Sequence, residues 1–310
     1  MDIDSDPGGA RKLFKSGFIA IVGAPNAGKS TLLNSILGEK VAITTPKPQT
    51  TRHQIKGILT GENFQAVFID TPGIHASKGL LNRVIVRAAT QALDGVDLVL
   101  FVVDVTRRNR AAEFRVLDLL DKVRKPVILV LNKIDLIARE NLLPMMAEFK
   151  EHYPFDVIVP ISAKYIDGID LLLDEILTKL PEGPQYYDST VITDQPEDMM
   201  ISELIREKIF LLAEKEIPYS TTVKVDSIEE PEGRKPLTIH ATIYVERPSQ
   251  KRIIIGKNGK FIKKAGRMAR EELENLWGQK VYLDLWVKVM KNWSRNERAL
   301  QELGITGMEV

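Results

Sequence analysis

The chain of 310 residues contains no cysteine. It can therefore form no disulfide bond and offers no thiolate to a metal, and its composition suits a reducing compartment. It also has no apolar run approaching the roughly 20 residues that a membrane-spanning helix needs. The formal net charge is only +1. A charge so close to zero excludes a general attraction to nucleic acid, so any basic binding surface must be local.

The N-terminal segment lacks the features of a targeting signal. Residues 1–9 are acidic and contain glycine and proline, whereas a secretory signal combines positive charge with an apolar core. We expect residues 1–15 to be a flexible extension and the protein to be cytoplasmic. The rest of the chain is long enough for two domains of ordinary size.

One glycine-rich segment carries a strong chemical signal, because it matches the phosphate-loop pattern G-x-x-x-x-G-K-[ST]. It follows an apolar run at 18–22 and leads into a helical pattern at 29–37. Such a loop directs consecutive N–H groups at a phosphate, and the helix N-terminus adds partial positive charge. We expect Lys29 to reach the β- and γ-phosphates and Ser30 to bind Mg²⁺. The predicted phosphate-binding residues are Gly23, Ala24, Pro25, Asn26, Ala27, Gly28, Lys29, Ser30 and Thr31.

Alternating strand and helix patterns extend from residue 16 to residue 182. Strand-like apolar runs fall at 18–22, 66–70, 98–104, 127–132 and 157–160, and helical patterns near 29–37, 81–93, 112–123, 139–150 and 169–180. Strands that are apolar on both faces and separated by helices predict an α/β domain with a mainly parallel sheet and helices on both faces. The segment 55–60 differs, because a turn at 61–63 predicts antiparallel pairing with 66–70.

Four further motifs lie near the ends of predicted strands, where open α/β sheets bind ligands. They are Thr50-Thr51-Arg52, Asp70-Thr71-Pro72-Gly73, Asn132-Lys133-Ile134-Asp135 and Ser162-Ala163-Lys164. Asp135 can accept hydrogen bonds from the N1–H and exocyclic amine of guanine, and adenine offers no matching donors. We expect the Ala163 N–H to face guanine O6. The Thr50-Thr51-Arg52 segment is a candidate sensor of the γ-phosphate and Mg²⁺.

The five motifs in this order resemble a GTPase of the translation-factor-related class. Hydrolysis in such an enzyme depends on positioning and on charge neutralisation around the γ-phosphate. We expect Ser30, Thr51 and Asp70 to hold Mg²⁺. We expect Lys29, Thr51 and the Gly73 N–H to stabilise the transferring phosphate.

Two positions bear on the rate of hydrolysis. Ile74 follows Gly73 within the predicted nucleotide site, where many regulatory GTPases carry a glutamine that orients the attacking water. Isoleucine cannot do so, and we therefore expect slow intrinsic turnover. In related GTPases the asparagine of a P-N-x-G-K-S loop helps to bind a potassium ion in place of an arginine finger. That resemblance makes Asn26 a candidate K⁺ ligand and catalytic residue, with stabilisation of its own loop as the alternative.

The pattern changes after a segment rich in proline and glycine at 180–188. We place a linker at 183–197 and a second domain at 198–310, which includes a C-terminal tail. Its patterns are a helix at 198–215, strands at 221–228 and 237–245, helices at 249–254 and 260–277, a strand at 281–289 and a helix at 294–303. In the strand at 281–289, the odd-numbered residues are predicted to face the hydrophobic core. Trp277, Trp286 and Trp293 receive no predicted role.

A G-x-x-G turn lies between two of these helices, in the sequence Ile-Ile-Ile-Gly-Lys-Asn-Gly-Lys at 253–260. Such a turn can clamp about four nucleotides of single-stranded RNA. Residues 251–270 contain eight basic and no acidic residues, which predicts a focused positive patch. The alternative is a tight turn with a solvated lysine face. The predicted RNA-binding residues are Arg252, Ile254, Ile255, Gly256, Lys257, Asn258, Gly259, Lys260, Lys263, Lys264 and Arg267.

The nucleotide motifs followed by this turn resemble the Era family of bacterial GTPases, over about residues 15–304. The resemblance implies a P-loop GTPase domain before a type II KH domain, with GTP or GDP, Mg²⁺ and K⁺ as ligands. It also implies binding to the 3′ end of 16S ribosomal RNA, a role in maturation of the small ribosomal subunit, and peripheral association with the cytoplasmic membrane. We expect a monomer with no DNA partner.

Contacts of Thr51 and Gly73 with the γ-phosphate would order the loops at 44–53 and 73–79 and so alter the interface with the KH domain. Such a switch requires different RNA affinities in the GTP and GDP states. The competing hypothesis is an RNA-binding assembly chaperone whose GTP site is structural and whose hydrolysis is incidental. A tRNA-modifying GTPase is disfavoured by the absence of cysteine and by the KH-like pattern. A membrane-signalling GTPase is disfavoured because the chain lacks a lipidation motif and an amphipathic anchor.

Overall fold

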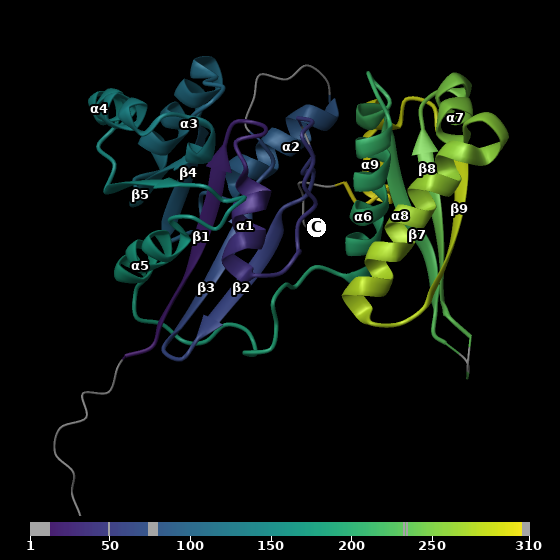
Figure 1. Cartoon of the computed structure of the whole chain (residues 1–310), viewed down its shortest axis with the longest axis horizontal. Coiled ribbons are helices and arrows are strands. Elements are labelled where there is room, and N and C mark those ends of the chain that lie inside the picture. The colour runs from purple at the N-terminus through teal and green to yellow at the C-terminus, as the bar shows by residue number, and fades with distance from the viewer. Residues whose placement is uncertain (1–12, 49, 74–79, 232, 234, 306–310) are drawn as a thin grey trace, which may run out of the picture.

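The computed structural model describes residues 13–305 except 49, 74–79, 232 and 234. Most of the expected N-terminal extension, Ile74 with the rest of the predicted loop 74–79, and residues 306–310 of the tail lie outside the described residues. Figure 1 shows two domains side by side, each with its own sheet. In the described part of the chain, no helix is both long enough and apolar enough to cross a bilayer.

The N-terminal domain is built on a sheet of six strands in the order β2-β3-β1-β4-β5-β6. The strands are β1 (Lys15–Gly23), β2 (Ile55–Gly61), β3 (Phe64–Asp70), β4 (Leu98–Asp104), β5 (Val127–Asn132) and β6 (Val157–Ile161). Only β2 runs antiparallel to its neighbour. This confirms the predicted mainly parallel sheet and its antiparallel hairpin.

Helices cover both faces of this sheet (Figure 1). They are α1 (Lys29–Leu37), α2 (Leu80–Gln91), α3 (Arg110–Val123), α4 (Leu142–His152) and α5 (Ile169–Lys179). The apolar sides of α1 and α5 pack on one face, and those of α2, α3 and α4 pack on the other. The parallel strands are buried on both faces. Their carboxyl ends lie at one edge of the sheet, and the loops at that edge carry the predicted nucleotide motifs.

The C-terminal domain has the predicted α-β-β-α-α-β order. Its elements are α6 (Glu197–Leu212), β7 (Thr221–Glu229), β8 (Leu237–Val245), α7 (Pro248–Ile255), α8 (Lys260–Trp277) and β9 (Val281–Val289). β7 pairs antiparallel with β8, and β8 pairs parallel with β9. Along β9, Val281 and Val287 are buried in the core while Tyr282 and Trp286 are exposed, as the alternation predicts. The predicted last helix divides into a short turn, η5 (Trp293–Arg295), and α9 (Glu297–Glu302).

The segment between the domains is bound to the N-terminal domain. The Ile58 N–H of β2 donates to the Ile192 carbonyl at 2.7 Å, and Lys56 pairs with Asp194 at 2.8 Å. The Gln65 side chain accepts hydrogen bonds from the Tyr186 and Tyr187 N–H groups. The predicted linker therefore covers the edge strand β2, which would otherwise present unpaired backbone groups.

The two domains share a small apolar core. Leu81 and Ile85 of α2 belong to one buried cluster with Trp293, Leu300, Leu303 and Ile305 from the C-terminal end of the described chain. In Figure 1, α6 and α9 lie on the side of the C-terminal domain that faces α2. Helix α2 is therefore packed against the second domain.

Candidate nucleotide and RNA sites

The phosphate loop joins β1 to α1 and lines a cavity of about 620 Å³ at the carboxyl edge of the sheet. Gly28 caps α1 with a φ of +97°, a conformation that favours glycine. A β-carbon at Gly28 would lie 2.2 Å from Asn132 Nδ2. The loop can close over the sheet only because this position carries no side chain. Ala24, Pro25, Asn26 and Thr31 also line the cavity, whereas Ala27 is buried beneath it.

Lys29 lies folded against its own loop. Its Nζ donates hydrogen bonds to the Gly23 and Ala24 carbonyl oxygens at 3.3 and 3.1 Å. Burial lowers the pKa of Lys29, and the negative charge of Asp70 opposes that shift. The side chain lines the cavity, where a phosphate would supply the negative charge that a buried ammonium group needs.

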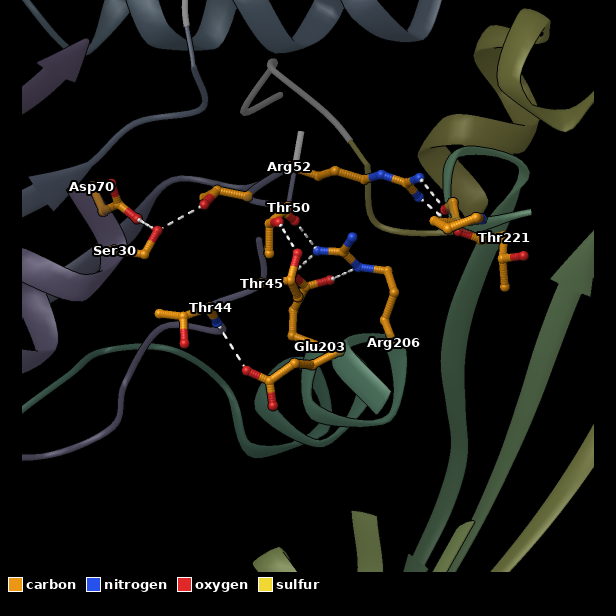
Figure 2. A network of polar contacts seen from close by, with 12 residues as sticks. Ser30, Thr44, Thr45, Thr50, Arg52, Asp70, Glu203, Arg206 and Thr221 are labelled. Atoms are coloured by element: carbon orange, nitrogen blue, oxygen red, sulfur yellow. Dashed lines mark hydrogen bonds and ion pairs between the residues drawn. The ribbon is translucent and has the colours of Figure 1, made fainter. Parts of the chain in front are cut away.

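The three predicted Mg²⁺ ligands lie within hydrogen-bond distance of one another through Ser30, and Figure 2 labels two of them, Ser30 and Asp70. The Ser30 hydroxyl donates to Asp70 Oδ2 at 2.5 Å, and Ser30 Oγ lies 2.9 Å from Thr51 Oγ1. Asp70 is fully buried, and its Oδ1 has no hydrogen-bond partner within the described chain. Burial raises the pKa of Asp70 to about 6, against the positive charge of Lys29. An orphaned carboxylate oxygen beside two hydroxyls fits Mg²⁺, which prefers oxygen ligands.

The rest of the motif after β3 holds that carboxylate in place. The Thr71 hydroxyl donates to the Ile21 carbonyl of β1 at 2.8 Å. Gly73 lines the cavity and lies so near the phosphate loop that a β-carbon there would approach Pro25 Cα to 2.8 Å. Pro72 lies between Thr71 and Gly73 in the chain. The predicted γ-phosphate contact of Gly73 is therefore at the cavity, whereas Ile74 is outside the described residues.

The predicted base-binding loops meet around Asn132. Its Nδ2 donates to the Ala27 carbonyl at 2.9 Å, and its Oδ1 accepts the Ala163 N–H at 3.0 Å. The Ala163 N–H, which the sequence predicts to face guanine O6, is thus engaged by Asn132 in this structure. Asp135 accepts a hydrogen bond from Ser162 at 2.6 Å, which fixes the carboxylate predicted to bind guanine. Ile134 begins the short turn that carries Asp135.

Lys133 and Lys164, the lysines of the two base-binding motifs, have different partners. Lys133 Nζ donates to the Asn26 carbonyl at 2.8 Å and to Asp104 Oδ2 at 2.5 Å, which ties the base loop to the phosphate loop. Lys164 lies exposed, with Nζ 4.9 Å from the centroid of the Tyr165 ring. Sequence reasoning missed Asp104. Its place at the carboxyl end of β4 was the available signal, because the other motifs occupy equivalent positions.

Asn26 connects the phosphate loop with the loop at 38–54, which carries the Thr50-Thr51-Arg52 segment. Asn26 Nδ2 donates to the Pro46 carbonyl at 3.0 Å. Thr50 and Thr51 line the cavity. Arg52 departs from the prediction, because its guanidinium extends away from Ser30 toward Thr221 of the other domain (Figure 2).

The predicted RNA surface lies on the turn from α7 through η4 (Lys257–Gly259) to α8. Gly256 has a φ of +73°, and a β-carbon there would lie 2.8 Å from the Phe261 nitrogen, so the turn requires glycine. Gly259 and Ile255 are partly exposed. The exposed polar residues of the prediction are Arg252, Lys257, Asn258, Lys260, Lys263, Lys264 and Arg267. The turn and the adjoining ends of α7 and α8 therefore present a run of exposed basic side chains at 252–267.

Ile254 is the exception, and the prediction that its side chain binds RNA is wrong. Its side chain is fully buried in the core of the C-terminal domain, whereas the side chain of Ile253 is 48% exposed. The physical reason is the helical position. In α7 the residue facing the sheet is Ile254, and its neighbours turn outward by about 100° each. The sequence shows three consecutive isoleucines and does not say which one faces inward.

Two family models match separate parts of the chain. The model described as 50S ribosome-binding GTPase matches residues 18–133, and the model described as KH domain matches residues 216–294. GTPase Era of Geobacter metallireducens is 50% identical over 293 residues, covering 94% of this chain and 98% of the relative. GTPase Era of Syntrophus aciditrophicus is 48% identical over 297 residues, covering 96% and 97%.

Solved structures agree over both domains. A crystal structure of Era in complex with MgGDPNP and nucleotides 1506–1542 of 16S ribosomal RNA matches with a TM-score of 0.91 and 41% identity, covering 94% of this chain and 99% of that chain. A variant of Aquifex aeolicus Era bound to GDP and aluminium fluoride matches with a TM-score of 0.91 and 40% identity, covering 94% and 100%. With this agreement over nearly its whole length, the chain belongs to the Era family of GTPases.

Proposed function

We propose that this protein binds and hydrolyses GTP, binds the 3′ end of small-subunit ribosomal RNA, and assists maturation of the small ribosomal subunit. One observation carries the proposal. A single chain combines the converging Ser30, Thr51 and Asp70 oxygens with the basic G-x-x-G turn, in the arrangement of an Era relative bound to both MgGDPNP and 16S ribosomal RNA.

The nucleotide chemistry follows from the positions of the side chains. Lys29 lies at the cavity and would exchange its two carbonyl partners for phosphate oxygens. Ser30, Thr51 and Asp70 would hold Mg²⁺, which neutralises charge on the β- and γ-phosphates. Asp135 would select guanine through its N1–H and amine. Asn26 would hold K⁺ beside the phosphates, as in related GTPases.

The RNA chemistry follows from the turn after α7. Gly256 and Gly259 leave the backbone accessible to a ribose–phosphate strand, and Lys257, Lys260 and Lys263 would pair with phosphates. Because the exposed basic residues at 252–267 concentrate positive charge in a nearly neutral chain, RNA binding would depend on this surface. We place the protein in the cytoplasm, where ribosomes assemble, with peripheral membrane contact as the second location to test by cell fractionation.

Two assays with the full chain test the function. GTP hydrolysis in Mg²⁺ should exceed ATP hydrolysis, and a 3′-terminal fragment of the organism's 16S ribosomal RNA should bind more tightly than a scrambled RNA of equal length. Preference for ATP, or equal affinity for both RNAs, would overturn the proposal.

The Lys29→Ala variant separates the enzyme from an assembly chaperone with a structural GTP site. If the variant fails to bind GTP yet still binds RNA and supports assembly of the subunit in cells, the chaperone hypothesis is favoured. If assembly fails while RNA binding persists, the nucleotide cycle is required. We expect the second result.

A further inference from the structure

Thr51, the candidate Mg²⁺ ligand in the loop at 38–54, has neighbours on both sides that are held by the C-terminal half of the chain. The Thr50 carbonyl oxygen accepts a hydrogen bond from Arg206 of α6. On the other side, the Arg52 side chain enters the KH domain. Figure 2 shows this division, with Ser30 and Asp70 on one side of the segment and Arg206 and Thr221 on the other. The segment therefore connects the metal site directly to the second domain.

Arg52 occupies a site shaped for a guanidinium group, which we name the Arg52 cage. Its polar members are three carbonyl oxygens, of Pro218 at 3.3 Å, Tyr219 at 3.1 Å and Thr221 at 2.9 Å. Its apolar members are the rings of Phe210 and Trp293, whose centroids lie 5.9 and 5.6 Å from Arg52 Cζ. Arg52 is 5% exposed. A planar fork with five N–H donors suits such a cage, and a lysine cannot satisfy it equally.

Arg206 is likewise buried and is held by an ion pair. It is 1% exposed, and its guanidinium forms an ion pair with Glu203 one turn earlier on α6. Because the paired guanidinium also donates to the Thr50 carbonyl, the backbone immediately before Thr51 is fastened to α6. Lys47 adds a third link, since its Nζ donates to the Phe210 and Ala213 carbonyls at the end of α6.

Trp293 connects the Arg52 cage to helix α2 of the N-terminal domain. It is fully buried, and its Nε1 donates to the Ser220 carbonyl at 3.2 Å. Trp293 also packs in the cluster that contains Leu81 and Ile85 of α2. One side chain thus touches both the guanidinium that follows Thr51 and the apolar side of α2.

The buried positive charge of Arg52 has no carboxylate partner among its described hydrogen bonds, which makes its position in the cage electrostatically costly. Its polar partners in the described chain are carbonyl oxygens rather than a carboxylate. Burial, and next the charge of Arg206, lower the pKa of Arg52, and Glu203 opposes the shift. A buried cation held mainly by dipoles is stable only while its geometry is kept. Displacement of the 50–52 segment therefore favours release of Arg52 from the KH domain.

We propose that Arg52 is a positioning residue through which the KH domain completes the Mg²⁺ site of the GTPase domain. With Arg52 in the cage and Arg206 on the Thr50 carbonyl, Thr51 Oγ1 is held 2.9 Å from Ser30 Oγ. By linkage, a ligand that fixes Thr51 favours the docked KH domain, and a partner that displaces the KH domain weakens Mg²⁺ binding by the same factor. The inference rests on the proposed GTP-binding function.

The test measures binding of a fluorescent, non-hydrolysable GTP analogue to the full chain as a function of Mg²⁺ concentration. In Arg52→Lys and in Arg206→Lys, the Mg²⁺ concentration for half-maximal binding should rise about tenfold, as expected when a charge-assisted hydrogen bond is lost. In Trp293→Phe, which keeps an apolar ring, the rise should be about threefold. Arg115→Lys, an exposed change on α3, is the matched control and should have no effect.

A second measurement removes ambiguity about folding. With Trp277→Phe and Trp286→Phe in place, Trp293 is the sole tryptophan, and its emission should change when the analogue and Mg²⁺ bind. The Arg52→Lys variant should lose most of that change while keeping the emission of a buried tryptophan. An unchanged Mg²⁺ dependence in folded Arg52→Lys would overturn the inference, as would a lower Tm with no change in Mg²⁺ dependence. Failure of the wild-type chain to prefer guanine nucleotides would instead refute the proposed function.

Discussion

Gly28 and Asn132 approach each other so closely that a β-carbon on Gly28 would lie 2.2 Å from Asn132 Nδ2. The same Asn132 amide bonds the Ala27 carbonyl and the Ala163 N–H, so this contact joins the phosphate loop to both base loops. The relationship makes the geometry of the phosphate site depend on that of the base site. It also gives a sharp mutational test.

Gly28→Ala should lower affinity for GDP by at least about 100-fold, because it places a methyl group on Asn132 and strains a residue with φ of +97°. Isothermal titration calorimetry measures the affinity. Gly38→Ala is the matched control, since Gly38 has φ of +71° but no atom within 4 Å of an added β-carbon. It should lower stability slightly and leave the affinity intact. Similar affinities of the two variants would contradict the clash.

Asp135→Asn should change the base preference of the site from guanine to xanthine. Asparagine cannot accept both guanine donors, but its amide can donate to the C2 carbonyl of xanthine. GTP affinity should fall about 100-fold or more, and xanthosine triphosphate should become the better ligand. Competition binding with the two triphosphates measures the ratio. Ser162→Ala removes only the hydrogen bond that fixes Asp135. It should lower the affinity for GTP without changing the preference for guanine over xanthine.

Mg²⁺ binding should weaken as the pH falls below about 6. Burial raises the pKa of Asp70 to about 6, so protons compete with Mg²⁺ for this carboxylate below that pH and do not compete above it. The Mg²⁺ concentration for half-maximal nucleotide binding should rise about tenfold per pH unit in the acid range. Titrations at pH 5.0, 6.0 and 7.5 measure it. In Asp70→Asn the steep dependence should disappear, and its persistence would assign it to another group.

The salt dependence of RNA binding should identify the lysines that contact phosphates. For single-stranded RNA, each lost contact lowers the slope of log K against log salt by roughly 0.7. Lys257→Ala and Lys260→Ala should each do so, while GTP hydrolysis without RNA stays at the wild-type rate. Lys280→Ala, whose side chain is 85% exposed outside the basic run, is the control. An equal loss of slope in the control would contradict a focused surface.

Potassium should accelerate hydrolysis if Asn26 is a K⁺ ligand. GTP turnover in potassium buffer should exceed that in sodium buffer of the same ionic strength, and Asn26→Ala should remove the difference. Because Asn26 Nδ2 also donates to the Pro46 carbonyl, the variant will loosen the loop in both buffers. The ratio of the two rates is therefore the informative quantity. A ratio of one in the wild-type chain would leave Asn26 with its structural role alone.

The local sequence determined the type of sheet, the phosphate loop and the base-binding carboxylate of this protein. Buried strands such as 98–104 are apolar on both faces and need helices on either side, so their pattern predicts a parallel sheet. The phosphate loop and Asp135 were identifiable because their chemistry depends on residue types at short, fixed spacing. The alternation along β9 correctly separated buried Val287 from exposed Trp286.

Tertiary structure alone decided the contacts between residues far apart in the chain. The sequence grouped Arg52 with Thr51 as a phosphate sensor, yet only the fold brings it to Thr221, 169 residues away. Trp293 showed no local signal, because its environment comes from α2 and the loop at 38–54. Local periodicity depends on neighbours within one or two turns. The coupling of the two domains depends on surfaces that become adjacent only when both have folded.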